Sequence, residues 1–418
     1  MSEKYDLAVV GGGAAGMAAA VSAASQWSAG SGRLKIALLE ANPRVGKKLL
    51  ATGNGRCNLT NMRIAPERYH GDADRILPML GDFSPQYIIE FFASLGLLCR
   101  ELDEGRVYPY NLQAAAVLDV LRAQLERFHV ETICGFPVGK VEKSAAGFLV
   151  SGPEHKIETR SLVFATGGMA YPQLGANESG YAVLKALGHS CTPLFPALVQ
   201  LKTDSRRAKP LKGARCAAKA ALLADGRPAG QSRGEVQFTE HGLSGICIFD
   251  LSRLAGEFRN AGLEVSLDLM PEFSARQVAE FLKRRQTALP FLPAADLLNG
   301  CLNRMVGQEI MKQVFPSLKK RMGDLNEREL SSASNAVKGF RFPVSGTLSW
   351  RDAQVTAGGV PLREVDGAMQ SRLCPGLYLA GEVLNIDGDC GGFNLHWAWS
   401  SGILAGRSAA LALKNGKR

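Results

Sequence analysis

The sequence predicts an α/β fold whose main domain is built on a parallel sheet and is interrupted in mid-chain by a differently patterned insertion. Three observations predict this fold. A glycine-rich turn follows a short apolar run near the N-terminus, strand and helix patterns alternate at both ends of the chain, and the middle lacks that alternation. The 418 residues are 46% hydrophobic and 21% charged, which suits a globular protein of two or three domains and excludes a disordered or fibrous chain.

The amino-terminal segment has the order strand, glycine turn, helix, strand, acid. The apolar run 5–10 predicts a buried parallel strand, and the next six residues, Gly-Gly-Gly-Ala-Ala-Gly, match the pattern G-x-G-x-x-G. An Ala-rich helix is expected over 17–25, and a second apolar run, 34–39, ends in Glu40. This order predicts a Rossmann-like dinucleotide site.

Each part of the turn has a physical role in such a site. Gly11 permits the tight turn, Gly13 lets the backbone approach a pyrophosphate, and Gly16 lets helix and strand pack closely. Glu40 is placed to bind a ribose hydroxyl pair, and a carboxylate there favours an unphosphorylated ribose, as in FAD or NAD. The residues predicted to bind the cofactor here are Gly11, Gly13, Ala14, Ala15, Gly16 and Glu40.

Two later segments favour FAD over NAD. The chain has no second glycine fingerprint in mid-chain, as a reductase with separate FAD and NAD(P)H domains usually shows. Instead, one strand ends in the turn Ala165–Gly168, and another, from Gly376, ends in Gly381-Glu382; two-dinucleotide-binding-type flavoproteins carry similar turns beside the flavin. We therefore expect tightly bound FAD contacted by Thr166, Gly167, Gly381 and Glu382, with NAD(P)H as a transient co-substrate.

Five ordered blocks carry a family resemblance. They are 47–61 (KKLLATGNGRCNLTN), Ala165–Gly168 continuing to Tyr171-Pro172, 238–245 (FTEHGLSG), 355–360 (VTAGGV) and 376–402. With these blocks the chain resembles the BaiN/RdsA family of FAD-dependent oxidoreductases over nearly its whole length. Departures from the family pattern at Asn385, at 369–372 and at His396 bear on the substrate rather than on FAD.

The resemblance implies a two-dinucleotide-binding-type, Rossmann-like FAD domain formed by residues 1–195 and 345–418. It is interrupted by a β-rich, barrel-like subdomain, 196–270, and a helical subdomain, 271–344; short alternating runs and helical periodicity in these ranges agree. Further residues are predicted to bind the cofactor: Lys47, Lys48, Arg56, Cys57, Asn58, Val138, Gly391, Gly392, Phe393, Asn394 and Leu395. Of these, the glycines precede a long helix whose N-terminus would stabilise negative charge on reduced flavin. Arg56 is suited either to the FAD pyrophosphate or to an anionic substrate.

Reduction of a polarised C=C bond needs a hydride from flavin N5 at one carbon and an acid at the other. Cys57, Cys390 and Asp387 are the candidate catalytic residues, although a buried thiol with only a packing role explains Cys57 slightly better. Further candidate acids are Asp389, Tyr171 and His396, the last of which suits a structural role better.

The positive charge is concentrated in the insertion. The chain carries 49 Lys and Arg against 39 Asp and Glu, a net charge of +10, and residues 196–344 carry 23 against 15, a net charge of +8. An ordinary solvated face explains this charge as well as a phosphate-binding surface does. The residues predicted to bind RNA are Lys202, Arg206, Arg207, Lys209, Lys212 and Arg215, and 283–285 and 319–321 form two more basic clusters.

Three functions follow from these features. The leading interpretation is a dihydrouridine synthase that reduces the C5=C6 bond of a uridine in 23S ribosomal RNA, because the family includes such enzymes and the insertion is basic. The alternatives are a small-molecule ene-reductase acting on a steroid-like enone and a non-catalytic flavin-containing RNA-binding protein.

The cellular context is predicted from composition. Nine dispersed cysteines without a C-x-x-C pair indicate reduced cytosolic thiols and no metal site, so we expect a cytoplasmic protein. The N-terminus lacks the apolar core of a signal peptide. Residues 7–32 are uncharged, but six glycines and several polar residues do not fit a membrane span. The sequence leaves the oligomeric state open.

Overall fold

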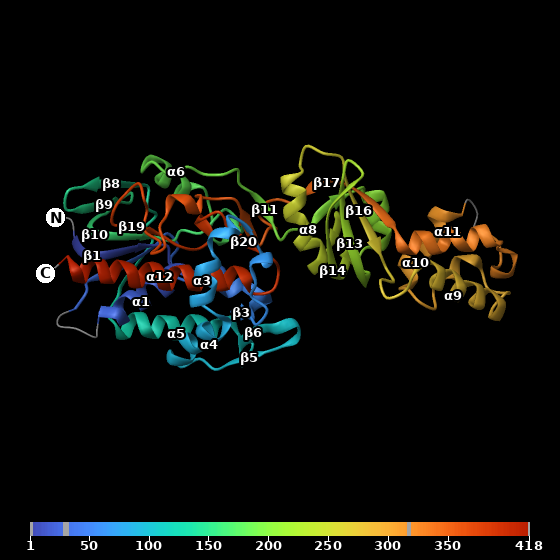
Figure 1. Cartoon of the computed structure of the whole chain (residues 1–418), viewed down its shortest axis with the longest axis horizontal. Coiled ribbons are helices and arrows are strands. Elements are labelled where there is room, and N and C mark those ends of the chain that lie inside the picture. Colours follow the sequence, from blue (N-terminus) through green and yellow to red (C-terminus); the bar gives the residue numbers. More distant parts are fainter. Residues whose placement is uncertain (1–2, 28–32, 316–318, 417–418) are drawn as a thin grey trace. The chain divides into compact units, whose positions relative to one another are not determined.

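The computed structural model describes residues 3–27, 33–315 and 319–416, and these form two compact units (Figure 1). Unit 1 comprises residues 1–195 and 355–418, and unit 2 comprises residues 196–354. The chain therefore leaves unit 1 once and returns once. Short strands β11 (Phe195–Ala197) and β18 (Val355–Ala357) pair at these two crossings.

A seven-stranded sheet forms the centre of unit 1, and its parallel core confirms the predicted α/β, Rossmann-like fold. The strands β2, β1 and β10 are the apolar runs on either side of the glycine turn and before Ala165, and they pair in parallel. β9 and β8 extend one edge in antiparallel fashion. In spatial order the strands are β7 (Glu131–Cys134), β2 (Ile36–Glu40), β1 (Glu3–Val10), β10 (Lys156–Phe164), β9 (Gly147–Ser151) and β8 (Lys140–Ser144), and β19 (Leu377–Leu379) also pairs with β10.

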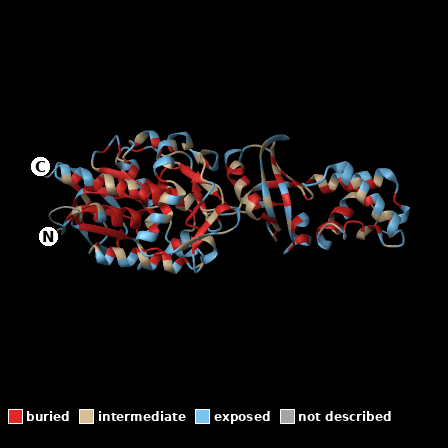
Figure 2. Ribbon diagram, turned by 60° about the horizontal axis from the view of Figure 1, so that its bottom comes forward, coloured by how far each residue is buried: buried red, intermediate tan, exposed pale blue. Residues whose placement is uncertain are grey.

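Two helices pack unusually closely against each other on this sheet, α1 (Ala14–Trp27) and α12 (Phe393–Asn415). A Cβ built on Gly402 would lie 2.3 Å from the Ala15 carbonyl oxygen, and one on Gly406 would lie 2.1 Å from that of Ala19. Only glycine permits this approach of two backbones. Figure 2 shows buried residues concentrated in the sheet and in the helices against it.

Unit 1 also contains smaller strands and helices outside the central sheet. β4 pairs with β20, and β6 lies between β3 and β5. The helix α5 packs against α1 and α2. The bounds are β3 (Thr60–Asn61), β4 (Tyr69–Gly71), β5 (Cys99–Glu101), β6 (Arg106–Pro109), β20 (Ile386–Gly388), α2 (Lys47–Ala51), α3 (Leu77–Asp82), α4 (Pro85–Ser94), α5 (Ala114–Arg127) and α6 (Ser179–Ala186).

Unit 2 contains a closed six-stranded barrel with one helix, α8 (Ile246–Glu257), packed on it. Its interior holds Phe238, Phe340 and Phe342, whose ring centroids lie 4.7–6.5 Å apart. The barrel order is β12 (Leu201–Thr203), β15 (Gly242–Ser244), β14 (Arg227–Phe238), β13 (Arg215–Ala224), β16 (Leu263–Asp268) and β17 (Phe340–Thr347).

The last barrel strand changes the boundaries that we predicted. β17 follows the helical segment in sequence, so the barrel is not confined to 196–270, and residues 345–354 lie in unit 2 rather than in the FAD domain. The physical reason is strand pairing: β17 closes the barrel by pairing with both β16 and β12.

The segment between β16 and β17 contains the helices α9 (Ala275–Ala288), α10 (Arg304–Val314) and α11 (Glu327–Lys338) among its described residues. Capping boxes at Ser274 and Asn326 fix the first turns of α9 and α11. The short α7 (Ser205–Ala208) lies between β12 and β13. One continuous hydrophobic cluster runs from Leu201 to Val344, so barrel and helices share a core.

Candidate active site

The glycine turn after β1 has the geometry that a dinucleotide needs. Gly11 has φ +107°, and a Cβ there would lie 2.3 Å from the Ala165 carbonyl oxygen. A Cβ on Gly16 would lie 1.8 Å from the carbonyl oxygen of Gly11, so this glycine is required for strand and helix to meet. At Gly13, by contrast, no described atom lies within 4 Å of the position that a Cβ would take, which leaves room for a phosphate against the backbone.

Glu40 lies at the end of β2 beside this turn and is 9% exposed. Its Oε2 accepts a hydrogen bond from the Gly12 N–H at 2.8 Å, and its Oε1 accepts from the Asn42 N–H at 2.8 Å and from Asn42 Nδ2 at 2.7 Å. The carboxylate is thereby fixed at the strand edge. Phe136 donates its N–H to the Glu40 carbonyl oxygen, which brings the half-buried Val138 to the same edge.

Two further turns lie at the carboxyl ends of adjacent strands β10 and β19. Gly167 has φ +75° with no described atom within 4 Å of its Cβ position, and the buried Thr166 Oγ1 has no hydrogen-bond partner among the described residues. Helix α12 holds Gly381 from both sides: its N–H donates to Ser401 Oγ at 2.9 Å, and its carbonyl oxygen accepts from Trp397 Nε1 at 3.1 Å.

The predicted phosphate-binding lysines make protein contacts. Lys48 Nζ lies 2.8 Å from Glu382 Oε2 in a half-buried ion pair, and the other carboxylate oxygen of Glu382 accepts from the Thr356 N–H at 2.8 Å. Lys47 Nζ donates to the Gln173 carbonyl oxygen at 3.3 Å. The Lys48 contact ties α2 to the carboxy-terminal segment, and the Lys47 contact ties it to the turn that contains Gln173. A role toward FAD phosphates stays a prediction for both lysines.

Cys57 lies in the loop after α2, and the surrounding protein covers it completely. The Cys57 side chain is fully buried, and burial raises its pKa to about 12. Beside it, the Arg56 guanidinium lies 5.3 Å from the Tyr108 ring centroid, and the buried Asn58 Oδ1 has no hydrogen-bond partner among the described residues. A buried thiol with so high a pKa is a poor proton donor near neutral pH, so packing explains Cys57 better than acid catalysis does.

Two glycines with positive φ lead into α12. Gly391 has φ +131° and Gly392 has φ +103°, and a Cβ on Gly392 would lie 2.6 Å from the Thr60 carbonyl oxygen. The Asn394 side chain accepts from the Gly388 N–H at 2.9 Å and donates to its carbonyl oxygen at 2.7 Å, which locks the approach to the helix. The N–H groups of the first helical turn, from Phe393 through the half-buried Leu395, therefore have a fixed direction.

The candidate acids differ in what surrounds them. Asp387 on β20 is 2% exposed, and Cys390 is half-buried. His396 is fully buried, its Nδ1 lies 2.8 Å from Thr60 Oγ1, and burial lowers its pKa to about 4, which fits a structural role. Tyr171 has φ +64° and precedes a short 3-10 turn.

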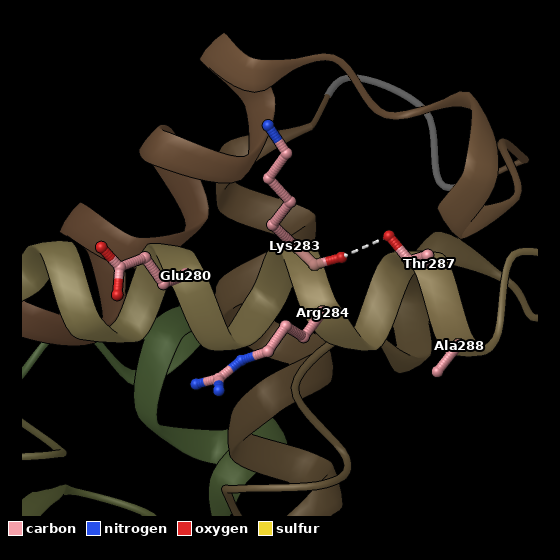
Figure 3. A pocket seen from close by; sticks show the side chains of 5 residues that line it. All are labelled: Glu280, Lys283, Arg284, Thr287 and Ala288. Carbon is pink, nitrogen blue, oxygen red and sulfur yellow. Dashed lines mark hydrogen bonds between the residues drawn. The ribbon is translucent and has the colours of Figure 1, made fainter.

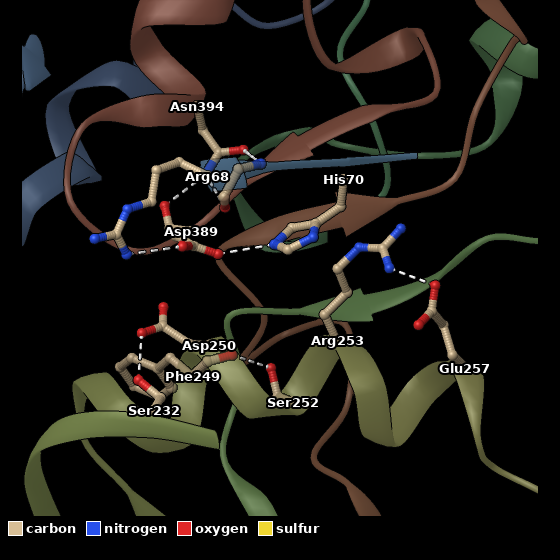
Figure 4. A network of polar contacts seen from close by, with 11 residues as sticks. Arg68, His70, Ser232, Phe249, Asp250, Ser252, Arg253, Glu257, Asp389 and Asn394 are labelled. Carbon is tan, nitrogen blue, oxygen red and sulfur yellow. Dashed lines mark hydrogen bonds and ion pairs between the residues drawn. The ribbon is translucent and has the colours of Figure 1, made fainter. Parts of the chain in front are cut away.

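Sequence reasoning missed two residues of this region, Arg68 and His70. Asp389 Oδ1 lies 2.8 Å from His70 Nε2, and its Oδ2 lies 3.3 Å from an Arg68 Nη atom (Figure 4). Both partners come from the β4 segment, which pairs with β20 in antiparallel fashion. No local pattern reveals this pairing, because more than 300 residues separate the two strands.

These features fit FAD. The backbone is open at Gly13 and Gly167, and the buried oxygens Thr166 Oγ1 and Asn58 Oδ1 have no hydrogen-bond partner among the described residues. Bound FAD would supply hydride chemistry at its N5 atom, while the chain supplies position and charge stabilisation.

A family model described as HI0933-like protein Rossmann domain matches residues 5–408. The chain belongs to the HI0933-like family. This membership confirms the family resemblance and the predicted class of enzyme, an FAD-dependent oxidoreductase acting on CH–CH bonds.

Two curated relatives of this HI0933-like protein match along its length. It is 36% identical over 413 residues to a 3-dehydro-bile acid delta(4,6)-reductase of Clostridium scindens, covering 97% of this chain and 98% of the relative. It is 28% identical over 411 residues to a ribosomal RNA dihydrouridine synthase of Escherichia coli, covering 96% of each.

Solved structures agree on the fold. The HI0933-like chain matches 3-ketosteroid delta1-dehydrogenase from Sterolibacterium denitrificans with a TM-score of 0.52 and 14% identity, covering 98% of this chain and 100% of that one. It also matches the E. coli quinol fumarate reductase subunit FrdA with a TM-score of 0.51 and 17% identity, covering 100% and 72%.

Three of the six basic residues predicted to bind RNA form ion pairs within unit 2. Of the six predicted to bind RNA, Arg206 pairs with Asp204 at 2.8 Å, Lys212 with Glu240 at 2.7 Å and Arg215 with Glu235 at 3.4 Å. Arg207 donates to the Arg341 carbonyl oxygen at 3.0 Å, Lys202 is on β12 and Lys209 follows α7; both of these are exposed. Such exposed ion pairs contribute little stability, but each carboxylate weakens the positive potential next to the basic side chain that it contacts.

The three basic residues 283–285 lie on α9 and have different surroundings. Lys283 pairs with Glu327 at 2.7 Å, and Arg285 donates to the Asp296 carbonyl oxygen. Arg284 lines an open depression of about 550 Å³ with Glu280, Lys283, Thr287 and Ala288 (Figure 3). The cluster 319–321 adjoins residues outside the described ranges.

Within the described ranges, the HI0933-like chain has no group of three or more His, Cys, Asp or Glu side chains suited to hold a metal ion. None of its described helices combines the length and the apolar character needed to cross a membrane.

Proposed function

We propose that this protein reduces a carbon–carbon double bond conjugated to a carbonyl group in a polycyclic, steroid-like small molecule, with NAD(P)H as the reductant. The observation that supports this most is the 36% identity to a 3-dehydro-bile acid delta(4,6)-reductase over 97% of the chain. A cytoplasmic location, expected from the dispersed free thiols, is part of the proposal.

The site residues have defined tasks in this reaction. The glycine turn and Glu40 would bind the dinucleotide, and the first turn of α12 would stabilise negative charge that develops beside it. Hydride addition to the β-carbon of an enone leaves an enolate, so a nearby group must protonate the α-carbon. The β4–β20 segment provides polar side chains next to the start of α12 for this task.

A ribosomal RNA uridine is the second candidate substrate. The excess of positive charge in the insertion and the 28% identity to a ribosomal RNA dihydrouridine synthase favour it. The pairing of Arg206, Lys212 and Arg215 with carboxylates weakens this support. A non-catalytic flavin-containing RNA-binding protein is not proposed further, because the enzyme class follows from the family.

One experiment separates the two substrates. Purified protein carrying FAD is reduced anaerobically with NADH or NADPH and then mixed with either a 3-oxo-4,6-diene bile acid or ribosomal RNA from a strain that lacks the gene. We expect reoxidation of the flavin and a mass gain of two hydrogens in the bile acid. Reoxidation by the RNA alone, with dihydrouridine in its digest, would replace the first candidate by the second.

The basic stretch offers a matched control for the RNA arm. Neutralising Arg206, Arg207 and Lys209 together should leave turnover of the bile acid unchanged. If RNA is the substrate, the same variant loses RNA affinity in a salt-dependent manner.

A further inference from the structure

A charged cluster lies at one end of the paired strands β4 and β20: His70 is on β4, Arg68 directly precedes β4, and Asp389 directly follows β20. His70 Nε2 lies 2.8 Å from Asp389 Oδ1, and an Arg68 Nη atom lies 3.3 Å from Asp389 Oδ2 (Figure 4). The Asp389 side chain is 14% exposed, and that of His70 is 30% exposed. The carboxylate is thus shielded and doubly contacted, while the imidazole keeps an open edge.

The cluster is fixed to the first turn of α12 by several contacts. The Asp389 N–H donates to the Arg68 carbonyl oxygen at 2.9 Å, and Asn394 holds the backbone of Gly388 just before it. The Tyr69 hydroxyl donates to the Phe393 carbonyl oxygen at 3.2 Å, and the Arg68 guanidinium lies 5.9 Å from the Phe393 ring centroid. His70 is therefore held beside the helix terminus that we assign to the flavin.

Three of the other candidate donors, Cys57, His396 and Asp387, lack the exposure that a proton donor needs. Cys57 is fully buried, and its pKa of about 12 leaves the thiol unable to give up a proton readily. His396 is also fully buried, and its pKa of about 4 keeps it neutral near pH 7. Asp387 is 2% exposed. His70 combines partial exposure with a carboxylate partner, and imidazole is the side chain that enzymes use most often as a general acid or base.

We propose that His70, oriented by Asp389, donates the proton that completes reduction of the substrate double bond. This inference rests on the proposed function. The double bond takes up a hydride from the reduced flavin at one carbon and a proton from His70 at the other, so the substrate gains two electrons and two hydrogens. His70 then regains its proton from solvent.

The hydrogen-bond geometry assigns roles to the two ring nitrogens. An ionised carboxylate only accepts hydrogen bonds, so the Nε2 that faces Asp389 carries a proton, and the transferable proton is on Nδ1 of the imidazolium. Asp389 stabilises this imidazolium and fixes the ring, and Arg68 orients the carboxylate through its other oxygen. Asp389 and Arg68 are thus positioning residues.

The test separates the two half-reactions of the FAD-loaded protein. His70→Ala should leave FAD content and flavin reduction by NAD(P)H unchanged and slow reoxidation by the substrate about 100-fold or more, the range for loss of a general acid. Added imidazole should restore much of the rate, which a merely structural role would not allow. His70→Gln, which keeps a similar size, guards against misfolding, and His155→Ala, at an exposed turn, is the matched control.

A second readout does not depend on activity. In ¹⁵N NMR spectra of the six histidines, one ring should show a protonated Nε2 that disappears in His70→Ala and shifts in Asp389→Asn. An unchanged spectrum in Asp389→Asn would overturn the assigned hydrogen bond and with it the proposal.

The kinetic outcomes are equally distinct. Reoxidation of His70→Ala at the rate of His155→Ala overturns the role of His70, and so does a loss that imidazole does not restore. If wild-type protein is reoxidised by neither bile acid nor RNA, the proposed function itself fails, and the inference falls with it. A working wild type with an unaffected His70 variant removes only the inference.

Discussion

The contact between α1 and α12 gives a prediction whose sign and size follow from two distances. A Cβ on Gly406 would lie 2.1 Å from the carbonyl oxygen of Ala19 and 2.7 Å from its carbonyl carbon, both in the backbone of the neighbouring helix. Backbone atoms cannot rotate away, so Gly406→Ala must push the helices apart. Overpacking of this kind costs about 2–3 kcal/mol, and the better helix propensity of alanine offsets about 1 kcal/mol of it.

The net loss of about 1–2 kcal/mol should lower the melting temperature by about 2–8 °C, at about 2–4 °C per kcal/mol for a domain of this size. Release of FAD fluorescence on heating reports the transition of unit 1. The control is Gly81→Ala in α3, where no described atom lies within 4 Å of the Cβ position, and where the same substitution should leave the melting temperature equal or higher. Equal shifts for both variants would refute the close-packing argument.

Three further predictions concern single side chains. Glu40→Gln should weaken FAD binding about 10- to 100-fold in a flavin fluorescence titration, because a charge-assisted hydrogen bond to the ribose contributes about 1.5–3 kcal/mol; unchanged affinity would contradict the assignment. Cys57→Ala should keep turnover within about twofold of wild type, since the thiol is fully buried, and a large loss in stopped-flow assays would restore it as a candidate acid. At Glu364, burial raises the pKa, but hydrogen bonds from Ser190 and His189 outweigh it and leave the pKa lowered, so its contribution to stability is present above the unfolded pKa and is lost as pH falls through the folded one. Urea unfolding from pH 7 down to pH 3 should show this loss in wild type and not in Glu364→Gln.

The features that the sequence predicts well are local ones. The glycine turn, its helix and Glu40 lie within 30 residues of one another, and Gly11 and Gly16 are required by backbone atoms that lie close to them. The long helix α12 and the turn Ala165–Gly168 are also predicted from neighbouring residues alone. Such elements follow from residue type and spacing, because their neighbours are close in the chain.

The features that the sequence does not predict depend on distant partners. β17 is separated from β12 by about 140 residues, so the pattern at 340–347 gives no sign that it closes the barrel. His70 and Asp389 are 319 residues apart and meet only because β4 pairs with β20. A count of charges along the sequence likewise does not show which basic residues are paired, since the ion pair Lys212–Glu240 exists only in the folded barrel.

The pairing of the first and last barrel strands makes the insertion an exchangeable module. Leu201 lies opposite Thr347, and the Leu348 N–H donates to the Gln200 carbonyl oxygen at 2.9 Å, so the chain enters and leaves the insertion at neighbouring points. Replacing some 150 residues by a short linker there would close only a small gap and require little loop-closure entropy. Unit 2 can then change in length and sequence while the sheet of unit 1 and its glycine turns stay as they are.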